Sequence, residues 1–384
     1  MDTAPPTRVS QYVRAIAYDD HEQLVDLHIA AFGNRDNSRE QISHYYSQVL
    51  HHVLEDPRPG APTNQSRCIV DNGRIVAIVI GCPVRVDYRG RSEWAVVGTL
   101  LSAWPGKVET ANVGQMLVDF ADGPQTMTMA DRANERGRRA AARVEFRDYP
   151  QYSLRWGRVI HPGTGAAGAL LNRKNLPRSL QRQALQIFAQ SLNASAKRIL
   201  ASQLDVPSPR SRIQSRSLRV SDVVDHGSTL LDGYVLRPDF SDASSIEFQW
   251  NQLDVLRPEG TMHRVAVLDS RDALVGWYLL HEWPTGTAEV VQLICAPKMA
   301  SDVIAQLLRH AHDLGVGSIH GDAPSSLLLP LANAGAHFYI RGSATVVHSR
   351  DPEVHETFAA GKAFITGLEG EYPVMLARAG SNDQ

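Results

Sequence analysis

Several polar side chains stand at the ends of apolar runs, where a strand or a turn could present them to a ligand. Glu93 directly precedes the apolar run that begins at Trp94, and a carboxylate at this position could act as a general base. Tyr152 opens the run YSLRWGRVI and Tyr149 lies just before it, so either phenol could act as a general acid. The structural alternatives are a solvated carboxylate at a strand end and a tyrosine that packs on a sheet.

A second group of candidates lies in the last third of the chain. Trp277 and Tyr278 are adjacent in VGWYLL, so only one of them faces a given side of a strand. Glu289 and Gln292 are three residues apart, which predicts opposite faces. His348 and Arg350 share a face in VVHSRD and could clamp a carboxylate or an acceptor group. The candidate substrate-binding residues are therefore Trp277, Glu289, His348 and Arg350, with roles in packing as the alternative.

One loop has the form of an anion site. After Pro105 the run GKVETANVGQMLVDFA leads from a strand into a helix, whose first N–H groups lack internal partners. Most junctions of this kind bind nothing, so an unliganded junction stays the alternative. The fifteen histidines form no H-E-x-x-H pattern and no group with carboxylates at metal spacing, and we predict no metal site.

Length and composition indicate an ordinary globular protein with two domains. The 384 residues exceed the roughly 250 to 300 that one hydrophobic core usually serves. Apolar residues make up 43% and charged residues 21%, which excludes a disordered or fibrous chain, and the net charge of −2 does not indicate nucleic acid. Three separated cysteines, no apolar leader and no run long enough to span a bilayer favour a soluble, cytoplasmic protein.

The near-neutral net charge conceals a basic segment. Residues 163–219 contain ten basic residues and one acidic residue, so they carry +9 and the remainder carries −11. An apolar helical face runs through this segment between Pro177 and Pro207. Such a helix either covers a neighbouring domain, which we favour, or contacts an anionic membrane surface through residues 173–198.

The order of strands and helices repeats. Each half reads as strand, helix, hairpin, long strand, helix and strand, which suggests a duplicated domain. We expect an α/β (α+β) protein of two mixed-sheet domains. Its expected parts are 1–162, a basic helical connector 163–229, and 230–384.

This layout resembles the GNAT superfamily of acyl-CoA-dependent N-acyltransferases, and in particular bacterial proteins with two such folds in tandem. The resemblance is carried by VGQMLVDFADGPQTMTMADRANERGRR and YSLRWGRVI in the first half, and by DALVGWYLL, VVHSRDPE and GKAFITGLEGE in the second. It implies that the fourth strand, Val96 to Trp104, splays from its neighbour to admit acyl-pantetheine. It also implies that the next loop, Glu109 to Gly114, holds the pyrophosphate. The cofactor-binding residues that it implies are Leu100, Leu101, Ala111, Asn112, Val113, Gly114, Gln115 and Asn134.

The sequence also departs from the superfamily. Glu109 places a carboxylate where the loop usually has Arg or Gln, and Ala141 stands where a tyrosine often serves as general acid. The corresponding loop of the second half, Ala296 to Ser301, has no glycine, so we expect the cofactor in the first half.

The resulting functional prediction is transfer of an acyl group from acetyl-CoA or another acyl-CoA to a small-molecule amine, with Glu93 as base and Tyr152 as acid. The alternatives are a non-catalytic protein of this fold that binds a ligand or partner, and a membrane-surface acyltransferase acting on a lipid-like substrate.

Overall fold

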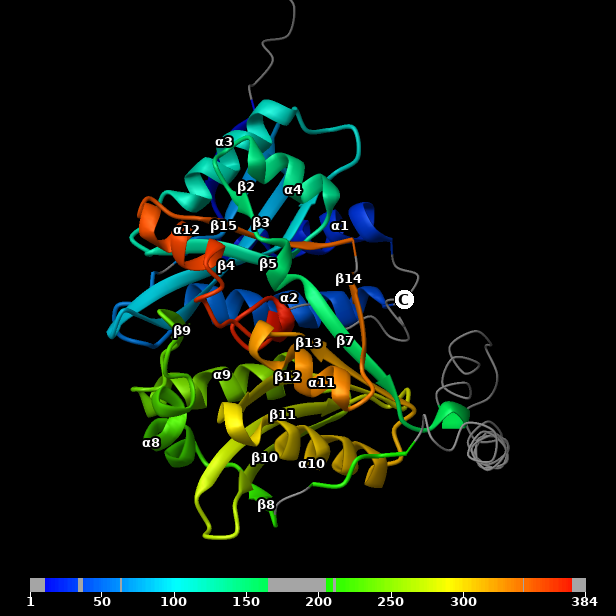
Figure 1. Ribbon diagram of the computed structural model, residues 1–384. Helices are drawn as coiled ribbons and strands as arrows, with labels where there is room; N and C mark the ends of the chain where they lie inside the picture. The colour runs from blue at the N-terminus through cyan, green and yellow to red at the C-terminus, as the bar shows by residue number, and fades with distance from the viewer. Residues whose placement is uncertain are drawn as a thin grey trace, which may run out of the picture.

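The described part of the chain forms two mixed β-sheets, each covered by helices (Figure 1). The computed structural model describes residues 11–33, 37–62, 64–164, 205–209, 212–340 and 342–374. This architecture confirms the predicted fold class. Among the described residues, no helix combines the length and the apolar character needed to cross a membrane. The predicted basic helix, including residues 173–198, lies outside the described residues.

The first sheet has the order β1-β2-β3-β4-β5-β15-β6, and β9 pairs with β3. Its strands are β1 (Tyr12–Ala15), β2 (Arg67–Asp71), β3 (Arg74–Tyr88), β4 (Arg91–Ala103), β5 (Met127–Ala133), β6 (Arg147–Asp148), β9 (Leu236–Pro238) and β15 (Ala344–His348). The helices around it are α1 (His21–Phe32), α2 (Arg39–Leu54), α3 (Thr110–Ala121), α4 (Glu135–Ala142) and α12 (Pro352–Ala359). Ser38 caps α2 by accepting the N–H of Gln41.

The second sheet has the order β14-β7-β13-β12-β11-β10-β8. Its strands are β7 (Leu154–Val159), β8 (Gln214–Ser217), β10 (Thr261–Leu268), β11 (Leu274–Glu282), β12 (Thr287–Cys295), β13 (Ser318–Asp322) and β14 (His337–Ile340). Its helices are α8 (Val220–Leu230), α9 (Ala243–Leu256), α10 (Ala300–Asp313) and α11 (Leu328–Asn333). The described end of the expected connector thus contributes β8 and α8.

The two halves of the chain exchange strands. From the first half, β7 pairs with β13 and β14 of the second sheet. From the second half, β15 pairs with β5 and β6 of the first sheet, while β9 pairs with β3. Figure 1 shows β7 running from the upper body into the lower sheet. Each sheet is therefore completed by the other half of the chain.

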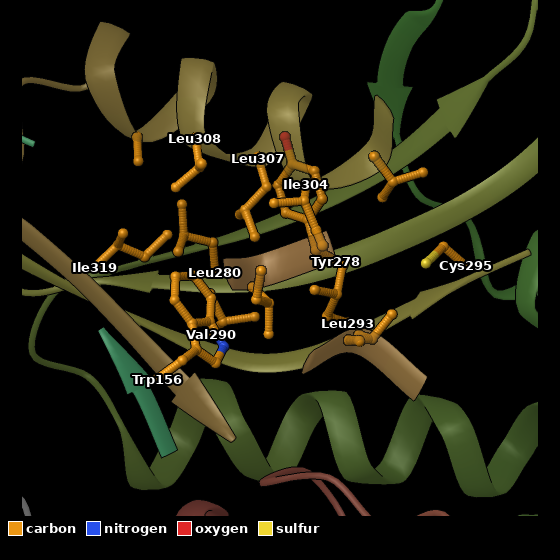
Figure 2. Packing of buried hydrophobic residues seen from close by; sticks show 14 of the residues in the cluster. Trp156, Tyr278, Leu280, Val290, Leu293, Cys295, Ile304, Leu307, Leu308 and Ile319 are labelled. Carbon is orange, nitrogen blue, oxygen red and sulfur yellow. The ribbon is translucent and has the colours of Figure 1, made fainter. Parts of the chain in front are cut away.

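The hydrophobic core between α10 and the second sheet shows how the exchanged strand β7 is held. Ile304, Leu307 and Leu308 of α10 point toward the sheet, as their helical spacing predicts (Figure 2). They meet residues of β11 and β12, and Trp156 of β7 lies in the same buried cluster. Burial of each such side chain stabilises the fold by about 1.5–3 kcal/mol, so β7 is an integral part of this core.

Candidate functional site

A cleft opens in the first sheet between β4 and β5. These parallel strands pair only where Ala95–Val97 faces Met127–Met129, and they diverge beyond that point. The divergence coincides with an irregularity in β4, because Ile80 faces Thr99 whereas Ile78 faces Ser102. Leu100, inside this bulge, has a φ of 53°, a conformation that few non-glycine residues adopt.

The cleft holds a cavity of about 330 Å³. Its walls come from β4, β5, α1, α3 and α4, together with Val346 of β15 and Glu371 of the C-terminal segment, residues 363–374. The apolar lining includes Leu100, Leu101, Leu117, Phe120, Met129, Ala141 and Phe146, and the polar lining includes His28, Asn37, Thr99, Arg132, Asn134 and Glu371. A mainly apolar pocket with a few polar groups is the usual form of a site for a small molecule or cofactor.

Three of the predicted cofactor-binding residues line this cavity: Leu100, Leu101 and Asn134. Asn134 is the N-cap of α4, and its Oδ1 accepts the N–H of Gly137 at 2.9 Å. Ala141, which occupies the place of the expected tyrosine, also lines the cavity, so no phenol is contributed from that position.

The other predicted cofactor-binding residues belong to the first turns of α3. We expected Glu109 to Gly114 as a loop, but Glu109 is the N-cap of α3 and the helix begins at Thr110. The residues from Thr110 to Val113 include no glycine or proline, so nothing in the sequence delays the start of the helix to Gly114. Ala111, Val113 and Gly114 are therefore helical, and two amides bond within the chain: Asn112 Nδ2 donates to Gln11 Oε1 at 2.9 Å, and Gln115 Nε2 donates to Asp119 Oδ1 at 2.6 Å.

The two predicted catalytic residues lie outside the cavity lining. Glu93 stands near the start of β4, where it accepts the hydroxyl of Thr126 at 3.1 Å. Leu100 lies seven positions further along the strand, a distance of roughly 20 Å. Tyr152 packs against Phe358, and its hydroxyl bonds to the backbone of Phe358 and Ala363. Burial raises the pKa of Tyr152 to about 12.

The four predicted substrate-binding residues do not form one site. Trp277 is fully buried and donates its indole N–H to Gln292 at 2.8 Å. Glu289 is buried in an ion pair with Arg155. His348 packs on Phe146 with ring centroids 5.3 Å apart, just behind the cavity wall. Arg350 is exposed and pairs with Asp122.

The expectation that Glu289 and Gln292 face opposite ways is wrong. His281 pairs with Glu289 and Leu279 pairs with Gln292, so the two residues share a face. The register shifts between Leu279 and Leu280, because β12 has one extra residue at Val291. A bulge of this kind reverses the alternation on which the expectation rested.

The corresponding cleft of the second sheet holds a segment of the chain itself. β12 and β13 pair from Thr287 to Val290. Beyond that point the segment 363–374 lies against β12. A Cβ on Gly367 would come within 3.1 Å of the carbonyl oxygen of Val291. Glu369 accepts Gln292 Nε2 at 2.9 Å and the backbone N–H of Thr366 at 3.1 Å. Burial raises the pKa of Glu369 to about 7.

The same segment brings Glu371 to the first cavity, a residue that sequence reasoning missed. Its carboxylate accepts the backbone N–H of Arg132 at 3.1 Å, and its own N–H donates to Asp131 Oδ1 at 2.7 Å. Burial, and then the charge of Asp131, raise the pKa of Glu371 to about 8. The available signal was a pair of glutamates within the otherwise apolar run AFITGLEGEYPVML.

No family model matches the chain, and no curated protein matches it in sequence. Solved structures do match. A probable N-acyltransferase from Enterococcus faecalis has a TM-score of 0.54 at 12% identity, over 89% of this chain and 73% of that one. N-myristoyltransferase of Saccharomyces cerevisiae, solved with bound myristoyl-CoA and inhibitors, has a TM-score of 0.51 at 12% identity, over 91% and 81%.

A GCN5-related N-acetyltransferase from Anabaena variabilis gives a similar result, with a TM-score of 0.53 at 10% identity, over 89% of this chain and 74% of that one. At these identities the likeness concerns the fold alone. The fold of the chain is therefore GNAT-like, in two domains built on the two mixed sheets.

Proposed function

We propose that this protein is an acyl-CoA-dependent N-acyltransferase that binds its donor in the cleft between β4 and β5. The observation that carries the proposal is the end of pairing between β4 and β5 after Val97, next to the bulge at Leu100. Backbone groups of β4 that lose a strand partner need other partners, and the amides of a pantetheine arm can provide them. The apolar walls next to this edge suit an acyl chain.

The remaining parts of the donor would extend from the cleft toward α3. The first N–H groups of a helix lack internal partners, so those near Thr110 and Ala111 could receive a pyrophosphate. Glu109 opposes this binding through its charge. Asn134 would lie beside the pantetheine at the start of α4.

A second candidate function is binding of acyl-CoA without transfer. The observation that favours it is Ala141, which leaves the cavity without the tyrosine that the resemblance implies as an acid. The membrane-surface alternative rests on residues 173–198 and stays a prediction.

Calorimetric titration with acetyl-CoA, octanoyl-CoA and myristoyl-CoA tests the binding site. We expect micromolar affinity for at least one donor, and at least a tenfold loss in Ala141→Phe, whose ring would fill the cavity. Ala332→Phe, on the exposed face of α11, is the matched control and should bind as the wild type does.

The same proteins, mixed with acyl-CoA and primary amines, should release free thiol. Release that depends on the amine supports the enzyme, whereas binding without release supports the second candidate. Absence of binding to all three donors at several hundred micromolar would refute both.

A further inference from the structure

The C-terminal segment 363–374 spans both sheets. Glu369 bonds to Gln292 in the second sheet, and Glu371 bonds to Asp131 and Arg132 in the first. On its far side the segment is fixed by Arg257, which donates to the carbonyl of Tyr372. The second half of the chain thereby contributes a side chain to the cavity of the first half.

Glu371 lies beside the irregular part of β4. Glu371 lines the cavity together with Thr99 and Leu100, and it is 9% exposed. The bulge at Leu100 is where the thioester of a donor in the cleft would pass the unpaired edge of β4. A carboxylate in this lining can therefore reach an amine that approaches the thioester, a position that Glu93 and Tyr152 do not have.

Glu371 and the charged groups around it comprise four carboxyl groups and three guanidinium groups. The charged groups around it, from every element packed there, are Asp131 and Arg132 of β5, Arg155 of β7, Glu289 of β12 and Asp322 of β13, with Arg257 after α9. Uncharged titratable groups near it include Tyr45 of α2, Cys82 of β3, the adjacent Tyr372, and His28 of α1, which lines the same cavity.

This setting favours a carboxyl that exchanges protons near neutral pH. Burial raises the pKa of Glu371 most and the charge of Asp131 raises it further, while Thr99 and Arg132 lower it, and the result is about 8. A general base is most effective when its pKa lies near the working pH. The ammonium of the acceptor also brings a positive charge to a cluster in which carboxyl groups, with Glu371 counted, outnumber guanidinium groups by four to three.

We propose that Glu371 is the general base for the acceptor amine, which rests on the proposed function. The acceptor ammonium gives one proton to the Glu371 carboxylate, and its nitrogen attacks the thioester carbonyl. The C–N bond forms, the C–S bond breaks, and the second proton of the nitrogen passes to the departing thiolate. Glu371 then releases its proton to solvent, so the products are the amide, free CoA and one proton.

The test compares Glu371→Gln, Glu371→Asp and Glu369→Gln with the wild type. Thiol release is followed from pH 6 to 10 with octanoyl-CoA and either butylamine or spermidine. For the wild type we expect kcat/KM to rise with pH and to level off near pH 8. Glu371→Gln should lose about 10²- to 10⁴-fold in kcat and lose the plateau, its residual rate rising with pH as solvent deprotonates the amine.

Further readouts separate a catalytic role from a structural one. Glu371→Gln should bind octanoyl-CoA within about threefold of the wild type, and Glu371→Asp should retain a plateau. Hydroxylamine, which is neutral at the assay pH and needs no base, should restore most of the rate of Glu371→Gln. Glu369→Gln alters the same segment, and it should keep the plateau whatever its effect on stability.

The outcomes distinguish this proposal from the function on which it rests. If the wild type binds and transfers but Glu371→Gln keeps the wild-type rate and plateau, Glu371 is not the base. Loss of the plateau in Glu93→Gln alone would assign that role to Glu93. If the wild type neither binds the donor nor releases thiol with either amine, the acyltransferase function itself is wrong.

Discussion

At the scale of single residues, the buried glutamates of the C-terminal segment give the protein a specific pH dependence. Burial raises the pKa of Glu369 to about 7 and that of Glu371 to about 8. In the unfolded chain both groups lose their protons near pH 4.3. Between these values the folded state holds protons that the unfolded state has lost, so the free energy of unfolding falls as pH rises.

Replacing Glu371 with Gln should remove its part of this slope. One group held protonated in the folded state costs at most about 1.4 kcal/mol per pH unit across this window. We expect Glu371→Gln to be more stable than the wild type at pH 8 and to differ little from it at pH 5, as measured by urea unfolding. The control is Glu353→Gln on α12, where an exposed ion pair with Arg89 is removed. Equal slopes for wild type and Glu371→Gln would contradict the assigned burial of this carboxyl.

At the scale of elements, the alternation and helical spacing of apolar residues predicted the order of strands and helices but not the bulges within the strands. The pattern of β4 contains nothing that marks Leu100 as a bulge, because leucine is an ordinary strand residue. The extra residue at Val291 likewise left the alternation looking regular, and the faces of Glu289 and Gln292 were assigned wrongly. The resemblance indicated where the cleft would open, whereas the residues that complete it from a distant segment, above all Glu371, required the structure.

The fit of the C-terminal segment against β5 can be tested at Gly370. A Cβ at this position would lie 2.4 Å from Oδ2 of Asp131, so Gly370→Ala should displace the segment. We expect a loss of about 1–3 kcal/mol in unfolding free energy and a lower rate of acyl transfer. In an Asp131→Ala background the obstructing carboxylate is absent, so the same substitution should cost less. Identical costs in the two backgrounds, measured by a double-mutant cycle, would show that the two residues do not meet.

At the scale of the whole molecule, the two GNAT-like domains are completed by each other. β7 belongs to the second sheet and β15 to the first, and the segment 363–374 bonds to both. The sequence predicted two similar halves because the order of elements is the same whether or not strands are exchanged. Only the pairing of strands distinguishes separate domains from this arrangement.

The exchange predicts that both domains unfold together. Without the second half of the chain the first sheet would lack β15, and without the first half the second sheet would lack β7. We therefore expect neither domain to be stable alone. Scanning calorimetry should show one transition, with the calorimetric and van't Hoff enthalpies in agreement. Two resolved transitions would show that the domains are stabilised separately.

The proposed donor site is tested most directly by a crystal structure of the protein with octanoyl-CoA. We expect electron density for the pantetheine arm between β4 and β5, the thioester beside Leu100, and the carboxylate of Glu371 facing the position of the incoming amine. Density for the coenzyme between β12 and β13, or none in the first cleft at saturating donor, would contradict the proposed site.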